Sequence, residues 1–364
     1  MKFKKWFAVL LVGCGQSCLL AEEPVNLSED VAGLLKDSDV PSMAVAVLQD
    51  GEVIAAGAWG IRKVGKKDEV TVEDKYHLGS CTKSMTATLG AVLIEEGKLR
   101  WDTTVKEVFE GVKIHEGYRE VTFEQLVTNT GGPPGDIEPI LWAELWEGRG
   151  SERRQRMQLV KGVLEGPPAY EPGSRNVYSN AGFSIAGAML EELLDQSYEE
   201  LMVEKLFEPL GMESAGFRAP SKNRKVDQPY GHMMEGEKVV PIDPEPRGDN
   251  PAAIAPAGAV HCSVGDYAKY ALMHLGSGKQ LVTKETLDLL HAAPKGEDYA
   301  KGWFVMRNGV LAHEGSNTMF HSIIVLSPKN QFGVVALCNF GGDEGSEKCN
   351  EAVELMMAEF GKRR

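Results

Sequence analysis

The sequence lacks long apolar runs, an excess of basic residues and dense cysteine. No stretch of the 364 residues approaches the roughly 18 apolar positions that suggest a transmembrane helix. Six cysteines are too few for a disulfide scaffold in a chain of this length. Lys and Arg number 39 against 53 Asp and Glu, a formal net charge of −14. This acid excess disfavours nucleic acid or an anionic lipid surface as a partner.

Histidine is also scarce, and its spacing excludes the familiar zinc-hydrolase patterns. The chain has eight His but neither a His-Glu-x-x-His nor a His-x-His sequence. What remains is an ordinary composition, 43% hydrophobic and 25% charged, which argues against disorder and against fibrous repeats. The length allows one large domain or two smaller ones, each able to bury a sizeable core.

Residues 1–21 have the composition of an export signal. Three lysines within the first five residues precede the apolar run 6–12, which is too short to span a bilayer but typical of a secretory signal. Two cleavage sites are open: a lipobox-like end that makes 1–13 the signal and Cys14 the lipid anchor, or cleavage after Ala21. An uncleaved anchor is the third reading. Removing residues 1–21 takes three positive charges from −14 and leaves −17. We expect an exported protein, periplasmic or secreted.

Export to an oxidising compartment permits disulfide bonds, but nothing in the cysteine spacing indicates one. The cysteines outside the signal and the motifs are Cys262, Cys338 and Cys349.

Hydrophobic patterning predicts strands at both ends of the chain and helices between them. Residues 42–48 and 52–59 are β-prone runs joined by Gln-Asp-Gly, a strong hairpin signal. Further strands are expected at 302–306, 309–313, 320–326 and 332–340. Helices are expected at 27–35, at 80–96, after the capping-box sequence Thr122–Gln125, and at 180–194, 263–275 and 347–360.

These elements predict an α+β fold of the sandwich type. One antiparallel sheet is assembled from both ends of the chain and flanked by terminal helices, and an all-helical lobe lies beside it. We expect a single catalytic domain over residues 22–364. Its sheet lobe covers about 22–75 and 295–364, and its helical lobe about 76–294. The cleft between the lobes is the natural place for a functional site.

The first candidate motif is Ser80-Cys81-Thr82-Lys83, at the start of an expected helix. Residues three apart share one helix face, so the Ser80 hydroxyl and the Lys83 amine can touch. The amine acts as a base only where the helix N-terminus and burial lower its pKa. Taken alone, the pattern also fits a capping serine followed by a solvated lysine. We interpret Cys81 as a small packing residue rather than a nucleophile.

The second candidate motif is Tyr178-Ser179-Asn180, which follows Pro172-Gly173 and leads into an apolar helix. A phenol near the serine can carry protons if cations lower its pKa. The Asn180 amide can orient a substrate carbonyl or amide. Taken alone, the tripeptide also fits a packed tyrosine before a helix cap.

The third candidate motif is His313-Glu314-Gly315-Ser316, at the end of an expected strand. Gly315 on an edge strand lets a substrate backbone approach closely. His313 can donate to a carboxylate or stabilise charge near the nucleophile. His313 and His321 lie symmetrically about the following turn, which allows them to face each other. Two histidines without a third ligand make a poor zinc site, and we expect no metal.

The order of the three motifs along the chain is far more specific than any one of them. In this order the sequence resembles the serine β-lactamase and penicillin-binding-protein superfamily, specifically its class C-like serine hydrolases. That group includes class C β-lactamases, D-Ala-D-Ala carboxypeptidases, D-aminopeptidases and esterases. The resemblance covers nearly all of the mature chain and includes the stretches 126–132, 170–174, 256–259, 324–328 and 334–336.

The resemblance implies a role for each candidate residue. Ser80 would be the acylated nucleophile, and Lys83 and Tyr178 would share the base role. Asn180 would bind the substrate amide, and the backbone N–H groups of Ser80 and Ser316 would form the oxyanion hole. The fold implied is β-lactamase/transpeptidase-like, in agreement with the elements above, and no cofactor is implied.

One departure from the family pattern guides the substrate prediction. Class C β-lactamases carry Lys-Thr-Gly at the third motif, whereas this chain has His-Glu-Gly, more like the D-aminopeptidase and esterase branches. A neutral imidazole supplies less positive charge for a carboxylate than lysine does. We therefore expect a monomeric serine hydrolase of neutral esters or amides, whether small molecules or peptides, including those derived from cell walls.

Two alternatives stay open. One lies within the same class, a D-Ala-D-Ala carboxypeptidase or weak β-lactamase. The other is a non-catalytic module that binds or senses peptidoglycan or β-lactams.

Overall fold

The computed structural model describes residues 23–246 and 248–361. The expected signal peptide and the lipid site at Cys14 lie outside the described residues. Within them, every helix is too short or too polar to cross a membrane.

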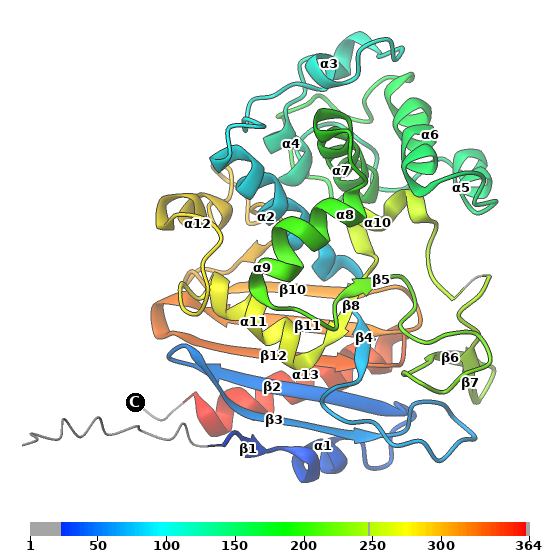
Figure 1. The fold of residues 1–364 in the computed structure, drawn as a ribbon, viewed down its shortest axis with the longest axis vertical. Coiled ribbons are helices and arrows are strands. Elements are labelled where there is room, and N and C mark those ends of the chain that lie inside the picture. The colour runs from blue at the N-terminus through cyan, green and yellow to red at the C-terminus, as the bar shows by residue number, and fades with distance from the viewer. Residues whose placement is uncertain (1–22, 247, 362–364) are drawn as a thin grey trace, which may run out of the picture.

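A seven-stranded sheet forms the base of the molecule in Figure 1, in the order β1-β3-β2-β12-β11-β10-β9. The N-terminal part of the chain supplies three neighbouring strands and the C-terminal part the other four. All pairs are antiparallel except β1 with β3, which run parallel over two residues. The predicted sheet built from both ends is thus confirmed. Its strands are β1 (Val25–Asn26), β2 (Ser42–Gln49), β3 (Glu52–Gly60), β9 (Phe304–Val305), β10 (Leu311–Ser316), β11 (His321–Ser327) and β12 (Phe332–Cys338).

The hairpin between β2 and β3 turns where the sequence predicts it. Asp50 and Gly51 have φ of 50° and 93°, and positive φ at both central residues is the feature of the turn type that fits the sheet's twist. This register fixes which side chains of β2 face each side of the sheet.

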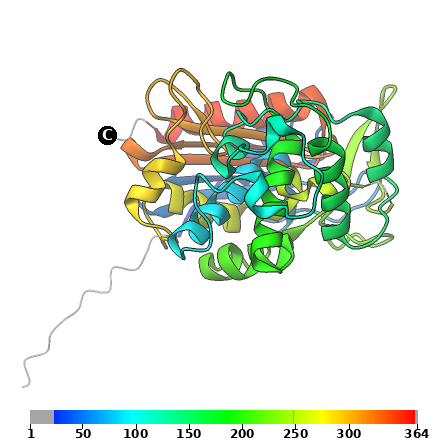
Figure 2. The same cartoon turned by 90° about the horizontal axis from the view of Figure 1, so that it is seen from above.

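Both faces of the sheet are buried. In β2, Met43, Val45 and Val47 belong to one apolar cluster, and the alternating Ala44, Ala46 and Leu48 to the other. The first cluster packs under α1 (Ser28–Leu34) and α13 (Gly342–Phe360), and Figure 2 shows α13, in red, running along that face. The second packs under α11 (Val264–His274), which contacts β2 and β12.

The position of α11 corrects the expected division of the chain. Residues 264–274 fall in the range expected for the helical lobe, yet α11 packs on the sheet. Its amphipathic pattern and its cap at Ser263, whose side chain accepts the Asp266 N–H, are local features. Neither the pattern nor the cap indicates which surface the helix covers.

The helical lobe stands on the β10 edge of the sheet (Figure 1). Helix α7 has the predicted bounds, and the Thr122–Gln125 capping box is present at α4. The hairpin β6–β7 was not predicted; its second strand contains Pro241, a residue that is uncommon within strands. The remaining helices and strands are α2 (Thr82–Glu95), α3 (Val105–Val108), α4 (Phe123–Val127), α5 (Pro139–Leu145), α6 (Glu152–Leu164), α7 (Asn180–Leu194), α8 (Tyr198–Met202), α9 (Glu208–Leu210), α10 (Ala255–Gly258), α12 (Lys284–Leu290), β4 (Lys75–His77), β5 (Gly216–Phe217), β6 (Gly231–Glu235), β7 (Lys238–Ile242) and β8 (Val260–Ser263).

A buried arginine joins the helices of this lobe. Arg156 on α6 donates to both carboxylate oxygens of Glu191 on α7, at 2.6 and 3.0 Å, and to Glu199 on α8, at 2.6 and 2.9 Å. Its side chain is fully buried and also donates to the Ala252 carbonyl. The guanidinium therefore supplies hydrogen bonds and a positive charge to two carboxylates that have little access to water.

We expect Arg156→Ala to lower the free energy of unfolding by about 3–5 kcal/mol, because it leaves these carboxylates without a cation. Urea denaturation measures the loss. Arg153→Ala on the same helix is the control, since Arg153 pairs with Glu192 and Asp195 at the surface and such pairs contribute about 0–1 kcal/mol. Equal losses in the two variants would contradict the assignment.

Candidate active site

The fold brings the three sequence motifs together where the helical lobe meets β10. Ser80 lies in a single 3-10 turn, Gly79–Cys81, that runs directly into α2. Asn180 begins α7, and the third motif occupies the last four residues of β10. The turn containing Ser80 packs against β10.

Lys83 is at the centre of this arrangement. Its amine contacts three acceptors from three segments: Ser80 Oγ at 3.1 Å, Asn180 Oδ1 at 2.7 Å and the Ala257 carbonyl oxygen at 2.7 Å. The side chain is fully buried. Burial disfavours the charged ammonium and lowers the pKa of Lys83 to about 7.

The hydrogen bonds determine what the neutral amine can do. Asn180 Oδ1 and the Ala257 carbonyl can only accept, so each takes an N–H of Lys83. A neutral amine has two N–H groups, and its lone pair is then left for the third neighbour, the Ser80 hydroxyl. Lys83 is thus placed to remove the proton of Ser80.

Tyr178 lies over the same amine, with Lys83 Nζ 4.6 Å from the centre of its ring. Its ring also meets Tyr299 edge to face, with 6.0 Å between centroids. Although Tyr178 is 37% exposed, desolvation by the surrounding protein raises the pKa of its hydroxyl above the usual value, and a hydrogen bond with Ser80 opposes this only in part. The condition considered from the sequence, that cations lower this pKa, is not met. Tyr178 keeps its proton at neutral pH and is therefore a hydrogen-bond donor beside Lys83.

The loop before α7 is fixed by Asn129. Its side-chain oxygen accepts the Ser179 N–H at 3.1 Å, and its carbonyl accepts the Val177 N–H at 2.8 Å. These bonds hold Tyr178 between two anchored neighbours. Asn180 is fixed in turn by Lys83, which uses the amide oxygen, so the NH₂ half of that amide is the donor that a substrate carbonyl requires.

His313 is a buried, neutral side chain. Its Nδ1 donates to the Glu314 carbonyl oxygen at 2.6 Å, and its Nε2 accepts from the Tyr299 hydroxyl at 3.2 Å. Burial, reinforced by Lys83, lowers the pKa of His313 to about 3. Since both ring nitrogens are engaged, the expected donor to a carboxylate is absent from this arrangement. His313 instead braces β10 against Tyr299.

The expected facing of His313 and His321 is also wrong. The register pairs His313 with Ile324 and His321 with Ser316. Within residues 23–246 and 248–361, no group of three or more His, Cys, Asp or Glu side chains is placed to hold a metal.

Gly315 and Gly79 allow two backbones to touch. A Cβ at Gly315 would collide with the Leu78 carbonyl oxygen and lie 2.6 Å from the Ser80 nitrogen. A Cβ at Gly79 would collide with the Ser316 nitrogen, and its φ of 50° is itself unfavourable for other residues. The backbone nitrogens of Ser80 and Ser316 therefore lie on two segments in direct contact.

In the described residues, the part of β10 that carries the third motif has no strand paired along its outer edge. Strand β9 pairs with Leu311 and Ala312, and the described ladder ends there. An extended substrate can lie along the edge beyond it.

The surroundings of Cys81 do not favour a reactive thiolate. It is fully buried and donates to the His313 carbonyl at 3.5 Å, and burial raises the pKa of its thiol to about 11. The four cysteines of the described residues, Cys81, Cys262, Cys338 and Cys349, are all free thiols.

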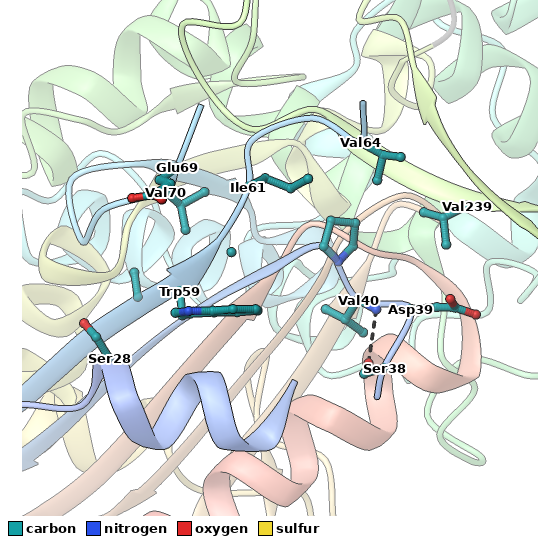
Figure 3. A pocket seen from close by; sticks show the side chains of 13 residues that line it. Ser28, Ser38, Asp39, Val40, Trp59, Ile61, Val64, Glu69, Val70 and Val239 are labelled. Atoms are coloured by element: carbon teal, nitrogen blue, oxygen red, sulfur yellow. Dashed lines mark hydrogen bonds between the residues drawn. The ribbon is translucent and has the colours of Figure 1, made fainter. Parts of the chain in front are cut away.

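A cavity of about 660 Å³ lies elsewhere, beside the end of β3 (Figure 3). Trp59, Val40 and Ile61 line it, together with Val239 from β7. It contains none of the motif residues, so the candidate site is the junction at Ser80 and not this cavity.

Sequence reasoning missed two partners of the site. The Ala257 carbonyl is a backbone group and has no side-chain signature, although the resemblance included residues 256–259. Tyr299 contacts both His313 and Tyr178. It lies just before β9, and the sequence around it has no recognisable motif.

The chain is similar to known proteins over most of its length. The family model described as beta-lactamase matches residues 27–355. The protein flp of Staphylococcus aureus strain MW2 is 26% identical over 316 residues, 85% of this chain. The chain spans 61% of the length of that relative. Penicillin-binding protein 4 of Amycolatopsis lactamdurans is 29% identical over 248 residues, 67% of this chain and 62% of that protein.

A solved structure shows the same fold. The octameric penicillin-binding protein homologue from Pyrococcus abyssi superimposes with a TM-score of 0.75 at 26% identity. The superposition covers 91% of this chain and 76% of the other.

The pKa of Lys83 predicts the pH dependence of Ser80 reactivity. Only the neutral amine accepts a proton, so labelling of Ser80 by an activated fluorophosphonate should rise about tenfold per pH unit below pH 7 and level off above it. The plateau should persist to about pH 9 because Tyr178 stays protonated. Labelling rates, corrected for hydrolysis of the probe, test this. A flat profile between about pH 5 and 7 would exclude Lys83 as the base.

Proposed function

Because the chain belongs to the beta-lactamase family over residues 27–355, we propose that it hydrolyses an ester or amide through an acyl-enzyme at Ser80. Its superfamily is that of the β-lactamase and penicillin-binding-protein serine hydrolases. The observation that carries the proposal is the hydrogen bonding of Lys83. Asn180 and the Ala257 carbonyl accept its two N–H groups, which leaves its lone pair for the Ser80 hydroxyl.

The reaction follows from the placement of these groups. Neutral Lys83 takes the Ser80 proton as Oγ attacks the substrate carbonyl carbon. The N–H groups of Ser80 and Ser316 stabilise the resulting oxyanion, a contribution of about 3–4 kcal/mol per donor. The proton passes through Tyr178 to the leaving alkoxide or amine as its bond to carbon breaks. Water then attacks the acyl-enzyme, gives a proton to the same relay, and Ser80 leaves with its proton restored.

The charges near β10 favour a substrate without a carboxylate. His313 is neutral, and Glu314, next to it on the free edge, is about half exposed. Its hydrogen bonds, first with His321 and then with Asn350 and Ser346, lower the pKa of Glu314, so it is ionised at neutral pH. A negative charge at this edge repels an anionic substrate group. The preferred substrates are therefore neutral esters or amides, of small molecules or peptides.

Similarity to a penicillin-binding protein supports a second candidate, a D-Ala-D-Ala carboxypeptidase or weak β-lactamase. Export, from the composition of residues 1–21, is part of the proposal. It places the enzyme where cell-wall peptides are available.

We expect Ser80→Ala to abolish labelling by a fluorophosphonate and to lower ester turnover at least about 10³-fold. Ser84→Ala, one turn further along α2, is the control and should keep the label. Mass spectrometry of the labelled peptide gives the outcome. Labelling that survives Ser80→Ala would refute the mechanism.

The same purified protein, tested on three substrates, distinguishes the candidate functions. Turnover of a short p-nitrophenyl ester, a chromogenic cephalosporin and a D-Ala-D-Ala peptide is compared. A preference for the ester supports the proposal, and a preference for either of the others supports the second candidate. Stoichiometric labelling without turnover of any of them supports a binding or sensing module.

Glu314→Gln should relax the discrimination against anionic substrates. Removing this charge should raise kcat/KM for a carboxylate-bearing ester roughly threefold to tenfold relative to its neutral analogue. Glu347→Gln is the control, since it removes an equal charge from the exposed side of α13. An unchanged ratio in Glu314→Gln would contradict the electrostatic argument.

A further inference from the structure

We infer that His77, Asp249 and Asn317 form a positioning bridge that sets the geometry of the oxyanion hole. The bridge joins the segment that carries Ser80 to the turn that follows Ser316. The inference rests on the proposed function, because it assigns the backbone N–H groups of those two serines to the oxyanion. None of the three bridge residues has a place in the motifs or in the proton transfers described above.

The first half of the bridge begins at the residue before the nucleophile. The Gly79 N–H donates to His77 Nδ1 at 3.0 Å. Because Nδ1 accepts, the ring proton is on Nε2, which donates to Asp249 Oδ2 at 3.0 Å. The imidazole thus has one tautomer and one orientation, and each nitrogen contacts a different segment.

The second half ends at the residue after Ser316. Asp249 Oδ1 accepts from Asn317 Nδ2 at 3.2 Å. The side-chain oxygen of Asn317 accepts the N–H groups of Met319 and Phe320, at 3.2 and 3.0 Å. Asn317 therefore shapes the turn between β10 and β11 and links it to Asp249.

All three side chains are removed from water. His77 is fully buried, and Asp249 and Asn317 are 4% and 1% exposed. Hydrogen bonds at such depth are strong, and no water competes for their donors. The carboxylate also accepts the Asn250 N–H at 2.7 Å, so its own loop is fixed to it.

The location of the bridge gives it a role beyond stability. One end contacts Gly79, directly before Ser80, and the other is Asn317, directly after Ser316. These two segments are the ones whose backbones touch at Gly79 and Gly315. Van der Waals contact prevents them from approaching further, and the bridge prevents them from separating. Stabilisation of an oxyanion depends on donors within a few tenths of an ångström of their ideal positions.

Two substitutions at His77 separate the halves of the bridge. In His77→Asn the amide oxygen replaces Nδ1 and can still accept from Gly79, but the side chain is too short to reach Asp249. In His77→Gln the amide nitrogen replaces Nε2 and can still donate to Asp249, but the acceptor for Gly79 is lost. Asp249→Asn keeps the shape of the side chain but replaces one acceptor oxygen with an NH₂ group. Either the His77 or the Asn317 hydrogen bond then has no acceptor.

We expect each variant to lower the limiting rate of Ser80 phosphonylation by roughly 10- to 100-fold, with the half-saturating probe concentration changed less than about twofold. The phosphonyl oxygen occupies the oxyanion hole, so this rate reports its geometry whatever the natural substrate is. The pH midpoint near 7 should stay, because Lys83 is unaffected. The double variant His77→Gln/Asp249→Asn should lower the limiting rate by a smaller factor than the product of the two single factors, because the two residues act as one unit.

His274→Gln is the matched control. His274 is also fully buried with both ring nitrogens engaged, by His291 and by Thr88. It should lower thermal stability and leave the labelling rate within about twofold.

The outcomes are distinguishable. Absence of labelling in the unmodified protein refutes the proposed function itself. Normal labelling in the unmodified protein and an unchanged limiting rate in the folded bridge variants overturn the bridge. An equal rate loss in His274→Gln also overturns it, since the effect is then general destabilisation. Should His77→Asn or His77→Gln fail to fold, the isosteric Asp249→Asn decides between these results.

Discussion

One buried amine joins the three segments that form the candidate site. Lys83 has no access to water, so each of its polar contacts must come from protein, and they come from the turn at Ser80, from α7 and from α10. Removing these acceptors would leave an unsatisfied buried amine. These three segments, all in the residue range of the helical lobe, are thus held around the amine at hydrogen-bonding distance. The same burial gives it the pKa of a base, so structural and chemical needs are met by one side chain.

Glycine sets the second constraint, at the contact between β10 and the nucleophile. Any side chain at Gly315 would collide with the Leu78 carbonyl and push the strand away from Ser80. Below this contact His313 and Tyr299 support the strand, and beyond it the turn at Asn317 is anchored to Asp249. The edge of β10 is therefore rigid although one side of it is unpaired. A rigid edge lets a substrate bind without first ordering the protein.

The parts of this structure that were predictable from sequence are those with local causes. The bounds of α7, the Asp50–Gly51 turn and the capping box at Thr122 follow from neighbouring residues. The three motifs were recognisable because their order along the chain is itself distinctive. His77 and Asp249 left no such signal, because they are 172 residues apart and each is an ordinary residue in its own segment. The sign of the pKa shift of Tyr178 was unpredictable for a similar reason, since it depends on burial by distant elements.

The pairing of β2 with β12 has a consequence for how the protein is made. Residues 43–49 bond to residues 332–338, so a ribosome must add about 280 residues after β2 before the centre of the sheet can close. Until then the N-terminal hairpin exposes an unpaired apolar strand, a surface prone to aggregation. Strand β10, which carries the third motif, is likewise synthesised more than 260 residues after β2. The candidate site at β10 therefore cannot be assembled before residue 316 has been added, and β2 lacks its β12 partner until residue 338 has been added.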